Sequence, residues 1–142
     1  QQPLRAGAYR VAPFICYEIV YSELVARAAR DADLLITVSN DTWFGNSIGP
    51  LQHLQIAQMR GRENGRYVLR ATNNGVSAII DHQGRIVAQS ERFVQTTLTG
   101  EAEVMLGNTP FSSFGTLPII VGCFATLAMM VLMYLGFWRE ES

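Results

Sequence analysis

Residues 9–38 read YRVAPFICYEIVYSELVARAARDADLLITV, and this stretch decides the fold. Tyr9–Ile15 is a short apolar run broken by a single Pro, which predicts a strand that ends at Cys16. Residues 19–30 mix apolar and charged side chains in the pattern of an amphipathic helix. Residues 34–38 form a continuous branched apolar run, which is typical of a strand covered on both faces. Strand, helix and strand in this order predict a βαβ unit.

The chain after this unit continues to alternate between loops, helices and strands. Residues 40–50 hold Gly, Pro, Asn, Asp and Ser, and predict a loop. Residues 51–64 show helical spacing of apolar positions, and Gly65 stands where a helix C-cap is expected. No element is predicted for residues 90–108. Three further strands are predicted at residues 67–72, 76–80 and 85–88, of which the last two form a hairpin.

A long apolar segment lies near the C-terminus. Residues 109–138 contain no Asp, Glu, Lys, Arg or His, and residues 117–137 are almost wholly apolar. At about 1.5 Å per residue, a helix of this length covers roughly 30 Å, which is the thickness of a bilayer's hydrocarbon core. The alternative, a buried core helix, is usually shorter and seldom apolar on every face. The segment therefore predicts a transmembrane helix.

Composition excludes several classes of function. The net charge is -1 and the basic residues are scattered, so nucleic acid is not an expected partner. All 11 basic residues are Arg, and the chain contains no Lys. Cys16 and Cys123 lie far apart, which predicts neither a disulfide framework nor a zinc site. We expect no metal and no cofactor, and we interpret Cys123 as an inert apolar residue within the membrane.

Cys16 is the candidate nucleophile because it stands between a predicted strand and a predicted helix. Backbone N–H groups at such a junction favour a thiolate and can donate to the oxyanion of a tetrahedral intermediate. The alternative role of a free Cys is that of a small buried hydrophobe. Tyr17 could pack beside an acyl group or donate a hydrogen bond. Glu18 could tune the thiolate, or it could stabilise the first turn of a helix.

Other side chains carry weaker signals. Trp43 and Phe44 lie on a loop flanked by Gly, where they could form an apolar wall for an acyl chain or simply pack onto the fold. We expect them to bind substrate. His53 and His82 have no nearby carboxylate or Cys cluster, so we expect surface or capping roles for both.

Three motifs resemble the nitrilase superfamily in order and spacing. FICYEI at residues 14–19 resembles its nucleophile segment, in which an apolar strand delivers a Cys that is followed shortly by an acid. RGREN at residues 60–64 is similar to its helix end. NNG at residues 73–75, followed by DHQGRI at residues 81–86, resembles its next pair of strands. The resemblance implies part of an α/β fold, a nitrilase-like αββα sandwich.

Within that superfamily the chain is similar to the C-terminal half of the apolipoprotein N-acyltransferase family. SNDTWFG at residues 39–45, GPLQH at residues 49–53 and RATNNG at residues 70–75 carry this likeness, together with the apolar C-terminal helix. The resemblance implies a Glu-Lys-Cys triad, of which Cys16 matches the third member. The Glu and Lys precede the Cys in the family, so the remaining N-terminal part of the same protein is an expected partner.

The resemblance also implies an activity and a location. A fatty acyl group would pass from a phospholipid through a Cys16 thioester to the N-terminal amine of a diacylglyceryl-Cys apolipoprotein. The alternatives are a membrane-tethered, nitrilase-like amidase and a catalytically dead scaffold. We expect residues 1–108 to belong to a catalytic domain on the periplasmic side of a bacterial inner membrane. Residues 109–138 would approach and cross the membrane, and residues 139–142 would form a cytoplasmic tail.

Overall fold

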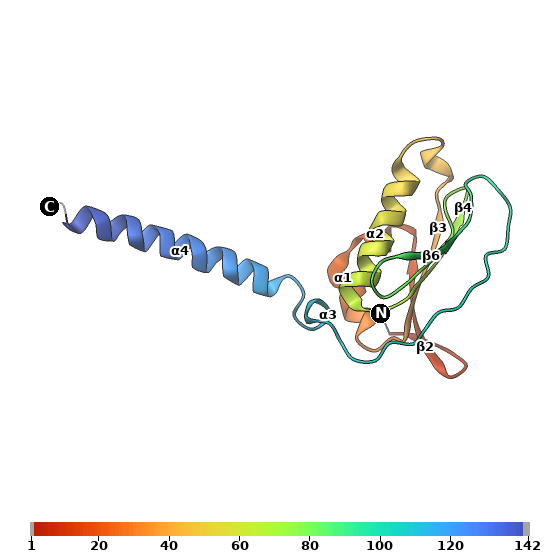
Figure 1. Ribbon diagram of the computed structural model, residues 1–142, viewed down its shortest axis with the longest axis horizontal. Coiled ribbons are helices and arrows are strands. Elements are labelled where there is room, and N and C mark those ends of the chain that lie inside the picture. The colour runs from red at the N-terminus through yellow and green to blue at the C-terminus, as the bar shows by residue number, and fades with distance from the viewer. Residues whose placement is uncertain (1, 141–142) are drawn as a thin grey trace.

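The core of the molecule is one mixed sheet in which the strands lie side by side in their sequence order (Figure 1). The computed structural model describes residues 2–140, with side chains described to residue 135. The central strands β2, β3 and β4 are parallel, whereas the pairs β1–β2, β4–β5 and β5–β6 are antiparallel. The strands are β1 (Leu4–Ala6), β2 (Tyr9–Ile15), β3 (Leu34–Asn40), β4 (Val68–Asn73), β5 (Ala78–Ile80) and β6 (Ile86–Gln89).

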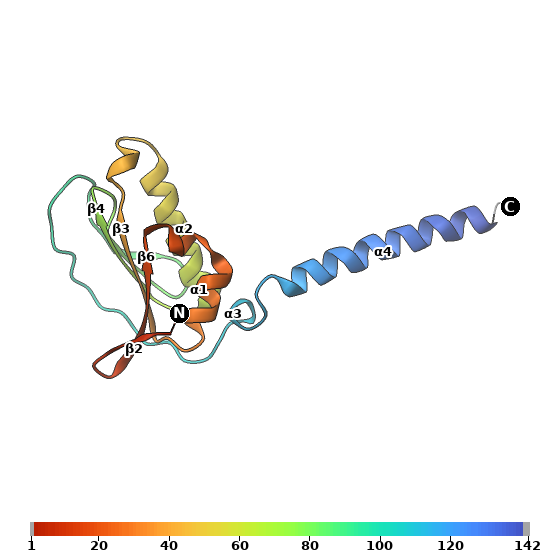
Figure 2. The same ribbon diagram turned by 180° about the vertical axis from the view of Figure 1, so that it is seen from behind.

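Two helices cover one face of this sheet, as the two opposite views show (Figures 1 and 2). They are α1 (Ser22–Ala29) and α2 (Gly49–Asn64). Successive strand residues point to opposite faces, so every second residue is buried under the helices. The side chains that fill this layer include Phe14, Leu35, Val68 and Ile80, all of which are fully buried.

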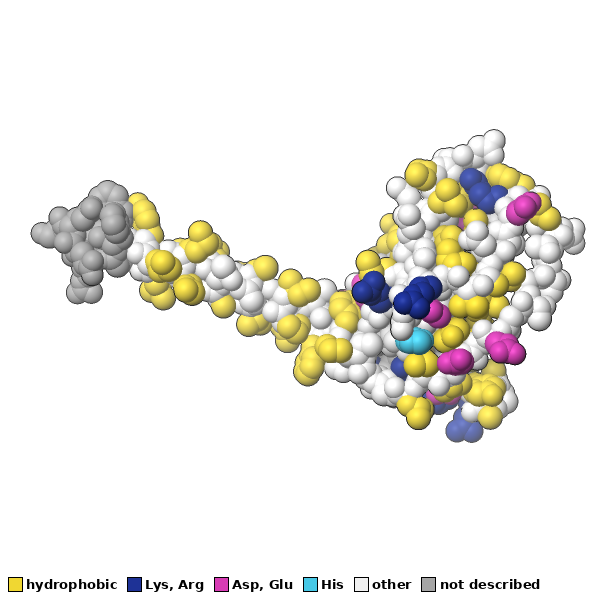
Figure 3. Space-filling view, in the orientation of Figure 1, with side chains coloured by type: hydrophobic (Ala, Val, Ile, Leu, Met, Phe, Trp, Pro, Cys, Tyr) yellow, Lys and Arg dark blue, Asp and Glu magenta, His cyan; other side chains and the backbone are white. Residues whose placement is uncertain are grey.

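The other face of the sheet is apolar but only partly covered. Ile15 and Val38 are 64% and 46% exposed at the ends of β2 and β3. An arm without helix or strand, residues 90–108, passes beside this face. Residues 96–100 of the arm and the sheet, including Ile36, border a groove of about 510 Å³. Figure 3 shows hydrophobic side chains on the domain beside this arm. A parallel sheet normally has both faces covered, so this face is suited to packing against further protein.

The predicted βαβ unit is confirmed, with β2 and β3 parallel and β2 at its predicted bounds. The single helix predicted for residues 19–30 is wrong in its bounds. A 3-10 helix, η1 (Cys16–Val20), comes first, and α1 follows after Tyr21. Tyr21 adopts an extended conformation with φ -80° and ψ 95°, which interrupts the helical path. The structure also has the short edge strand β1, which the sequence pattern did not predict.

The end of α2 and the hairpin after it agree with the predictions. Gly65 caps α2 in the left-handed conformation, at φ 60°, and its N–H donates to the Gly61 carbonyl. Only Gly adopts this conformation at little cost, which is why it marks the helix end. β5 and β6 form the predicted antiparallel hairpin, and the arm has no regular element, as expected.

The C-terminal part consists of a short helix α3 (Pro110–Phe114) and a long helix α4 (Leu117–Glu140). Thr109 caps α3, because its hydroxyl accepts the N–H of Ser112 at 3.0 Å. Residues Leu117–Leu135 have a mean hydropathy of 2.2 and none of them is buried, so α4 is long and apolar enough to cross a membrane. The expected tail, residues 139–142, lies outside the residues whose side chains are described.

α1 holds the start of α4 directly. The Glu23 carboxylate accepts both the backbone N–H of Thr116, at 3.0 Å, and the Thr116 hydroxyl, at 2.9 Å. Arg30, one residue beyond α1, donates to the carbonyls of Ser112 and Ser113 in α3. The helix that follows the Cys16 junction is therefore tied to the segment that leads into the apolar helix.

This tie gives a pH-dependent prediction. The hydrogen bond from the Thr116 backbone holds the pKa of Glu23 below its ordinary value, and the Thr116 hydroxyl acts in the same direction. A carboxyl whose pKa is lower in the folded state stabilises that state above its unfolded pKa, and the gain is lost as pH falls through the folded value. We expect the Thr116 amide resonance to titrate with a midpoint below 4.5. Glu23→Gln should abolish this titration, and a midpoint above 4.5 would contradict the assignment.

Candidate active site

Cys16 occupies a strained elbow at the end of β2. Its φ is 51°, a left-handed conformation that is uncommon for a residue with a side chain. Such strain persists only where the surrounding structure enforces it, and it often marks a functional site. The side chain is partly exposed and borders an open pocket of about 590 Å³ together with Val38, Trp43 and Ala71. The predicted junction is confirmed, but the helix after it has only five residues, so its dipole contributes little.

The two residues after Cys16 lie apart from the sulfur. Glu18 turns back to accept the backbone N–H of Ile15 at 2.8 Å, which braces the elbow from the strand side. Tyr17 is 61% exposed and packs edge-on against the ring of Tyr21, at 5.7 Å between centroids. Within residues 2–135, no hydrogen bond joins Tyr17 or Glu18 to the Cys16 sulfur. The geometry matches the first-turn role of Glu18, and the catalytic roles of both residues stay predictions.

A buried carboxylate lies behind the elbow. Asp41, 1% exposed, follows β3 and accepts the hydroxyl of Ser39 through Oδ1. The same oxygen lies 3.2 Å from Nδ1 of His53, and Oδ2 accepts Nη2 of Arg70 at 2.7 Å. We call these four residues, Ser39, Asp41, His53 and Arg70, the Asp41 cluster. β3, α2 and β4 each contribute to it, so the fold brings together residues that are distant in sequence.

The Asp41 cluster contacts Cys16 at two points. The Ser39 hydroxyl lies 3.7 Å from the Cys16 sulfur, and Nε2 of His53 lies 3.2 Å from the Cys16 carbonyl oxygen. His53 is 6% exposed, so the surface or capping role expected for it is wrong. The expectation failed because the buried face of α2 mixes His53 with apolar residues. The sequence held one indication of a buried polar site here, because the charged residue Asp41 closely follows a predicted apolar strand.

Arg70 supplies the cation of the cluster from the middle of β4. Its side chain is fully buried, and its Nε donates to the Val76 carbonyl at 3.2 Å. Burial lowers the pKa of its guanidinium, whereas the negative charges of Asp41 and of an ionised Cys16 raise it. The interaction with Cys16 places the guanidinium within electrostatic reach of the nucleophile. A charged residue inside the apolar run of a predicted strand was the sequence signal for this role.

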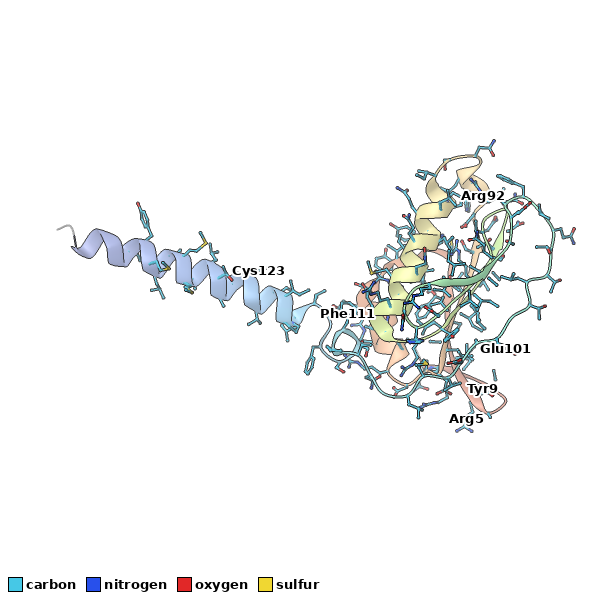
Figure 4. The ribbon with its side chains drawn as sticks, in the orientation of Figure 1. Arg5, Tyr9, Arg92, Glu101, Phe111 and Cys123 are labelled. Atoms are coloured by element: carbon cyan, nitrogen blue, oxygen red, sulfur yellow. The ribbon has the colours of Figure 1, made fainter. Side chains whose placement is uncertain are left out.

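The loop between β3 and α2 forms one wall beside Cys16. Trp43 is 82% exposed and Phe44 is 41% exposed, and both lie in a short 3-10 helix, η2 (Thr42–Phe44). Arg92 of the arm fastens the loop, because its guanidinium donates to the carbonyls of Gly45 at 2.6 Å and Ser47 at 3.4 Å. Figure 4 shows Arg92 at this end of the domain. The loop therefore presents exposed apolar side chains, and its backbone is anchored to the arm by Arg92.

The remaining candidate residues lie elsewhere. Cys123 is exposed on α4, away from the sheet domain (Figure 4). His82 lies in the turn between β5 and β6, where its ring approaches that of Tyr67 at 6.1 Å. Among the described residues, no group of three or more His, Cys, Asp or Glu side chains is placed to hold a metal ion.

Similarity to known proteins agrees with this geometry. The family model described as carbon-nitrogen hydrolase matches residues 2–110. The chain is 52% identical over 132 residues to an apolipoprotein N-acyltransferase of Pseudomonas putida, a match that covers 93% of this chain and 26% of the relative. It is 55% identical over 119 residues to the apolipoprotein N-acyltransferase of Pseudomonas aeruginosa, covering 84% and 23%. The chain thus spans about a quarter of the length of the curated relatives it matches.

Solved structures agree on the fold. A carbon-nitrogen hydrolase from Helicobacter pylori aligns with a TM-score of 0.55 at 16% sequence identity, over 63% of this chain and 39% of that chain. At this identity the likeness concerns the fold alone, which is a mixed α/β sheet of the nitrilase type with the apolar helix α4 added. The family match over residues 2–110 shows that the chain belongs to the carbon-nitrogen hydrolase family of the nitrilase superfamily, as its motifs predict.

Proposed function

We propose that this chain is the C-terminal part of an apolipoprotein N-acyltransferase, in which Cys16 carries the acyl group. The observation that carries the proposal is the position of Cys16, on a strained elbow that opens toward an exposed apolar wall. A hydrolase acting on small soluble substrates has no evident use for the apolar helix α4. The names of the relatives, which match at 52% and 55% identity, point to the same activity.

The chemistry would proceed by two transfers. The Cys16 thiolate attacks the carbonyl carbon of a phospholipid ester, a C–S bond forms, and the C–O bond breaks to release a lysophospholipid whose alkoxide takes a proton. The free N-terminal amine of the diacylglyceryl-Cys apolipoprotein then attacks the thioester. A C–N bond forms, the C–S bond breaks, and the amine proton passes to a general base. The thiolate is thereby regenerated.

A proton-transferring residue must come from outside this chain. The chain contains no Lys, and the pKa of Arg is too high for a guanidinium to shuttle protons at neutral pH. We assign the Lys and Glu of the triad to the remaining N-terminal part of the same protein. The half-exposed apolar face of the sheet, with Ile15 and Val38 next to Cys16, is the surface on which that part would pack.

The proposed site lies at a membrane. α4 would cross a bacterial inner membrane, with the sheet domain on the periplasmic side and residues 139–142 in the cytoplasm. Its 19-residue apolar stretch supports the crossing, while the direction follows from the family resemblance. The exposed aromatic side chains of Trp43 and Phe44 would then meet acyl chains rather than water.

The direct test is capture of the acyl-enzyme. The complete protein, incubated with phospholipid and no acceptor, should gain the mass of one acyl group on the peptide that contains Cys16. Hydroxylamine should remove this increment, as expected of a thioester, and the apolipoprotein should discharge it into an N-acylated product. Release of free fatty acid alone would show hydrolysis of the acyl-enzyme rather than acyl transfer, and would contradict the proposed function. An adduct on any other residue would overturn the assignment of the nucleophile.

The aromatic loop gives a second prediction. Trp43→Ala should lower kcat/KM for acyl transfer about tenfold while changing the free energy of unfolding by less than about 0.5 kcal/mol, because a side chain that is 82% exposed adds little to the core. Steady-state kinetics and thermal melting of the complete protein measure both. Tyr9→Ala is the matched control, because Tyr9 is also exposed, at 52%, but lies on the β1–β2 hairpin (Figure 4). Equal losses in the two variants would remove the loop from substrate binding.

A further inference from the structure

The hydrogen bonds of His53 determine which nitrogens carry hydrogen. Nε2 lies 3.2 Å from the Cys16 carbonyl oxygen, which can only accept, so this nitrogen must be a donor. Nδ1 lies 3.2 Å from Oδ1 of Asp41, which as a carboxylate also only accepts. Asp41 is ionised because its other oxygen pairs with the buried guanidinium of Arg70. Only an imidazolium, with hydrogen on both nitrogens, satisfies the two contacts together.

The charges of the cluster therefore do not cancel. Arg70 and His53 are cationic, Asp41 is anionic, and all three are buried. Glu18, the other carboxylate at the elbow, accepts the Ile15 N–H and forms no hydrogen bond or ion pair with the cluster among the described side chains. Because a buried net charge is costly unless it is paired, one further negative charge is favoured next to the cluster. Cys16 contacts the cluster through Ser39 and through its own carbonyl, and its thiolate can supply this charge.

We propose that the Asp41 cluster is a positioning unit for Cys16, which holds the strained elbow through the Cys16 carbonyl and keeps one net positive charge behind the thiolate. This inference rests on the proposed function in taking Cys16 as the nucleophile. His53, Asp41 and Arg70 act through Cys16 and do not touch the substrate. They complement a triad Lys rather than replace it, because they stabilise the thiolate without moving its proton.

Ser39 couples the charge of the cluster to the sulfur. Its hydroxyl has one hydrogen and faces two acceptors, Oδ1 of Asp41 and the Cys16 sulfur at 3.7 Å. With a neutral thiol, the hydroxyl donates to Asp41 and can accept the S–H. Once the thiolate forms, the hydroxyl can turn and donate to sulfur, while His53 and Arg70 still satisfy the carboxylate. Rotation of one hydroxyl thus adapts the site to either state of Cys16.

The test measures the thiol itself, without acyl transfer. In the complete protein, iodoacetamide alkylation of the Cys16 peptide is followed by mass spectrometry between pH 5 and pH 10. His53→Gln keeps a side-chain amide that can donate to the Cys16 carbonyl but removes the charge. We expect its alkylation to be about tenfold slower at pH 7, with the midpoint of the pH profile moved upward and the rate at high pH retained. His82→Gln is the matched control and should keep the wild-type profile.

A second pair of variants separates positioning from folding. Ser39→Ala removes the hydroxyl with little change in volume and should also slow alkylation at pH 7, whereas Ser39→Thr keeps a hydroxyl and should restore it. Wild-type profiles in both His53→Gln and Ser39→Ala would overturn the proposal. A uniform loss of rate at every pH, without a moved midpoint, would also overturn it, because only a structural role would remain. If alkylation responds as expected but no acyl adduct forms, this inference stands and the proposed function fails.

Discussion

Replacing Cys16 by Ser is expected to lower acyl transfer by at least about 10³-fold in the complete protein. An alcohol is far harder to ionise than a thiol, and the surroundings of Cys16 suit a large, polarisable anion. The Ser39 hydroxyl lies 3.7 Å from the sulfur, a distance that fits a bond to sulfur and is too long for one to oxygen. A Ser side chain would thus lose both its ionised form and its contact with Ser39.

The measurement is the initial rate of N-acylation of a synthetic diacylglyceryl peptide by detergent-solubilised enzyme. Cys16→Ala should fall to the same background, since it lacks any nucleophile. Cys123→Ser should retain wild-type rates, because Cys123 is exposed on α4 and away from the sheet domain. Full activity of Cys16→Ala would show that another residue carries the acyl group, and the scaffold alternative would then gain ground.

Local signals explain the parts of the fold that the sequence predicts correctly. β2 has the predicted bounds because its apolar run is interrupted on both sides, and α2 ends at Gly65 because left-handed backbone there requires Gly. β1 was missed because its three residues are all exposed and carry no alternating pattern. α3 was missed although Thr109 followed by Pro110 is a recognisable helix start, since a helix of five residues has too few positions to show periodicity.

In the candidate site, too, local sequence signals predict some features and miss others. Cys16 could be found from sequence because strand, thiol and helix follow one another along the chain. Asp41 and Arg70 each stand out in the sequence, but their association in the Asp41 cluster could not be found, because its members come from three separate elements and meet only when β3, β4 and α2 pack together. His53 is the clearest case: apolar spacing predicts its helix, but Leu51 and Met59, two of the apolar residues in that pattern, are exposed whereas His53 is buried. Tertiary packing decides its role.

Gly75 offers a way to disturb the cluster without altering any of its members. A Cβ atom at this position would clash with Oδ2 of Asp41 and would lie 3.0 Å from the hydroxyl oxygen of Thr72. Real Cβ atoms do not approach other atoms so closely, so the carboxylate would have to move. Oδ2 is the oxygen that pairs with Arg70 at 2.7 Å, and this pair is fully buried. The absence of a side chain at Gly75 is therefore a requirement of the cluster.

Gly75→Ala is accordingly expected to lower the free energy of unfolding by about 1–3 kcal/mol, as overpacking does elsewhere, and to slow acyl transfer at least about tenfold. Thermal melting and N-acylation rates measure the two effects. Gly122→Ala is the control, because a Cβ there meets nothing within 4 Å. The backbone of Gly75 is not left-handed, so any loss comes from the contact with Asp41 rather than from backbone strain.

A stable Gly75→Ala protein with wild-type alkylation of Cys16 would mean that Asp41 can shift without consequence, which would contradict a tightly held carboxylate. If alkylation instead slows, and the midpoint of its pH profile moves upward as in His53→Gln, then substitutions at two separate positions affect Cys16 in the same way. The shared element is the Asp41 carboxylate, which both positions contact.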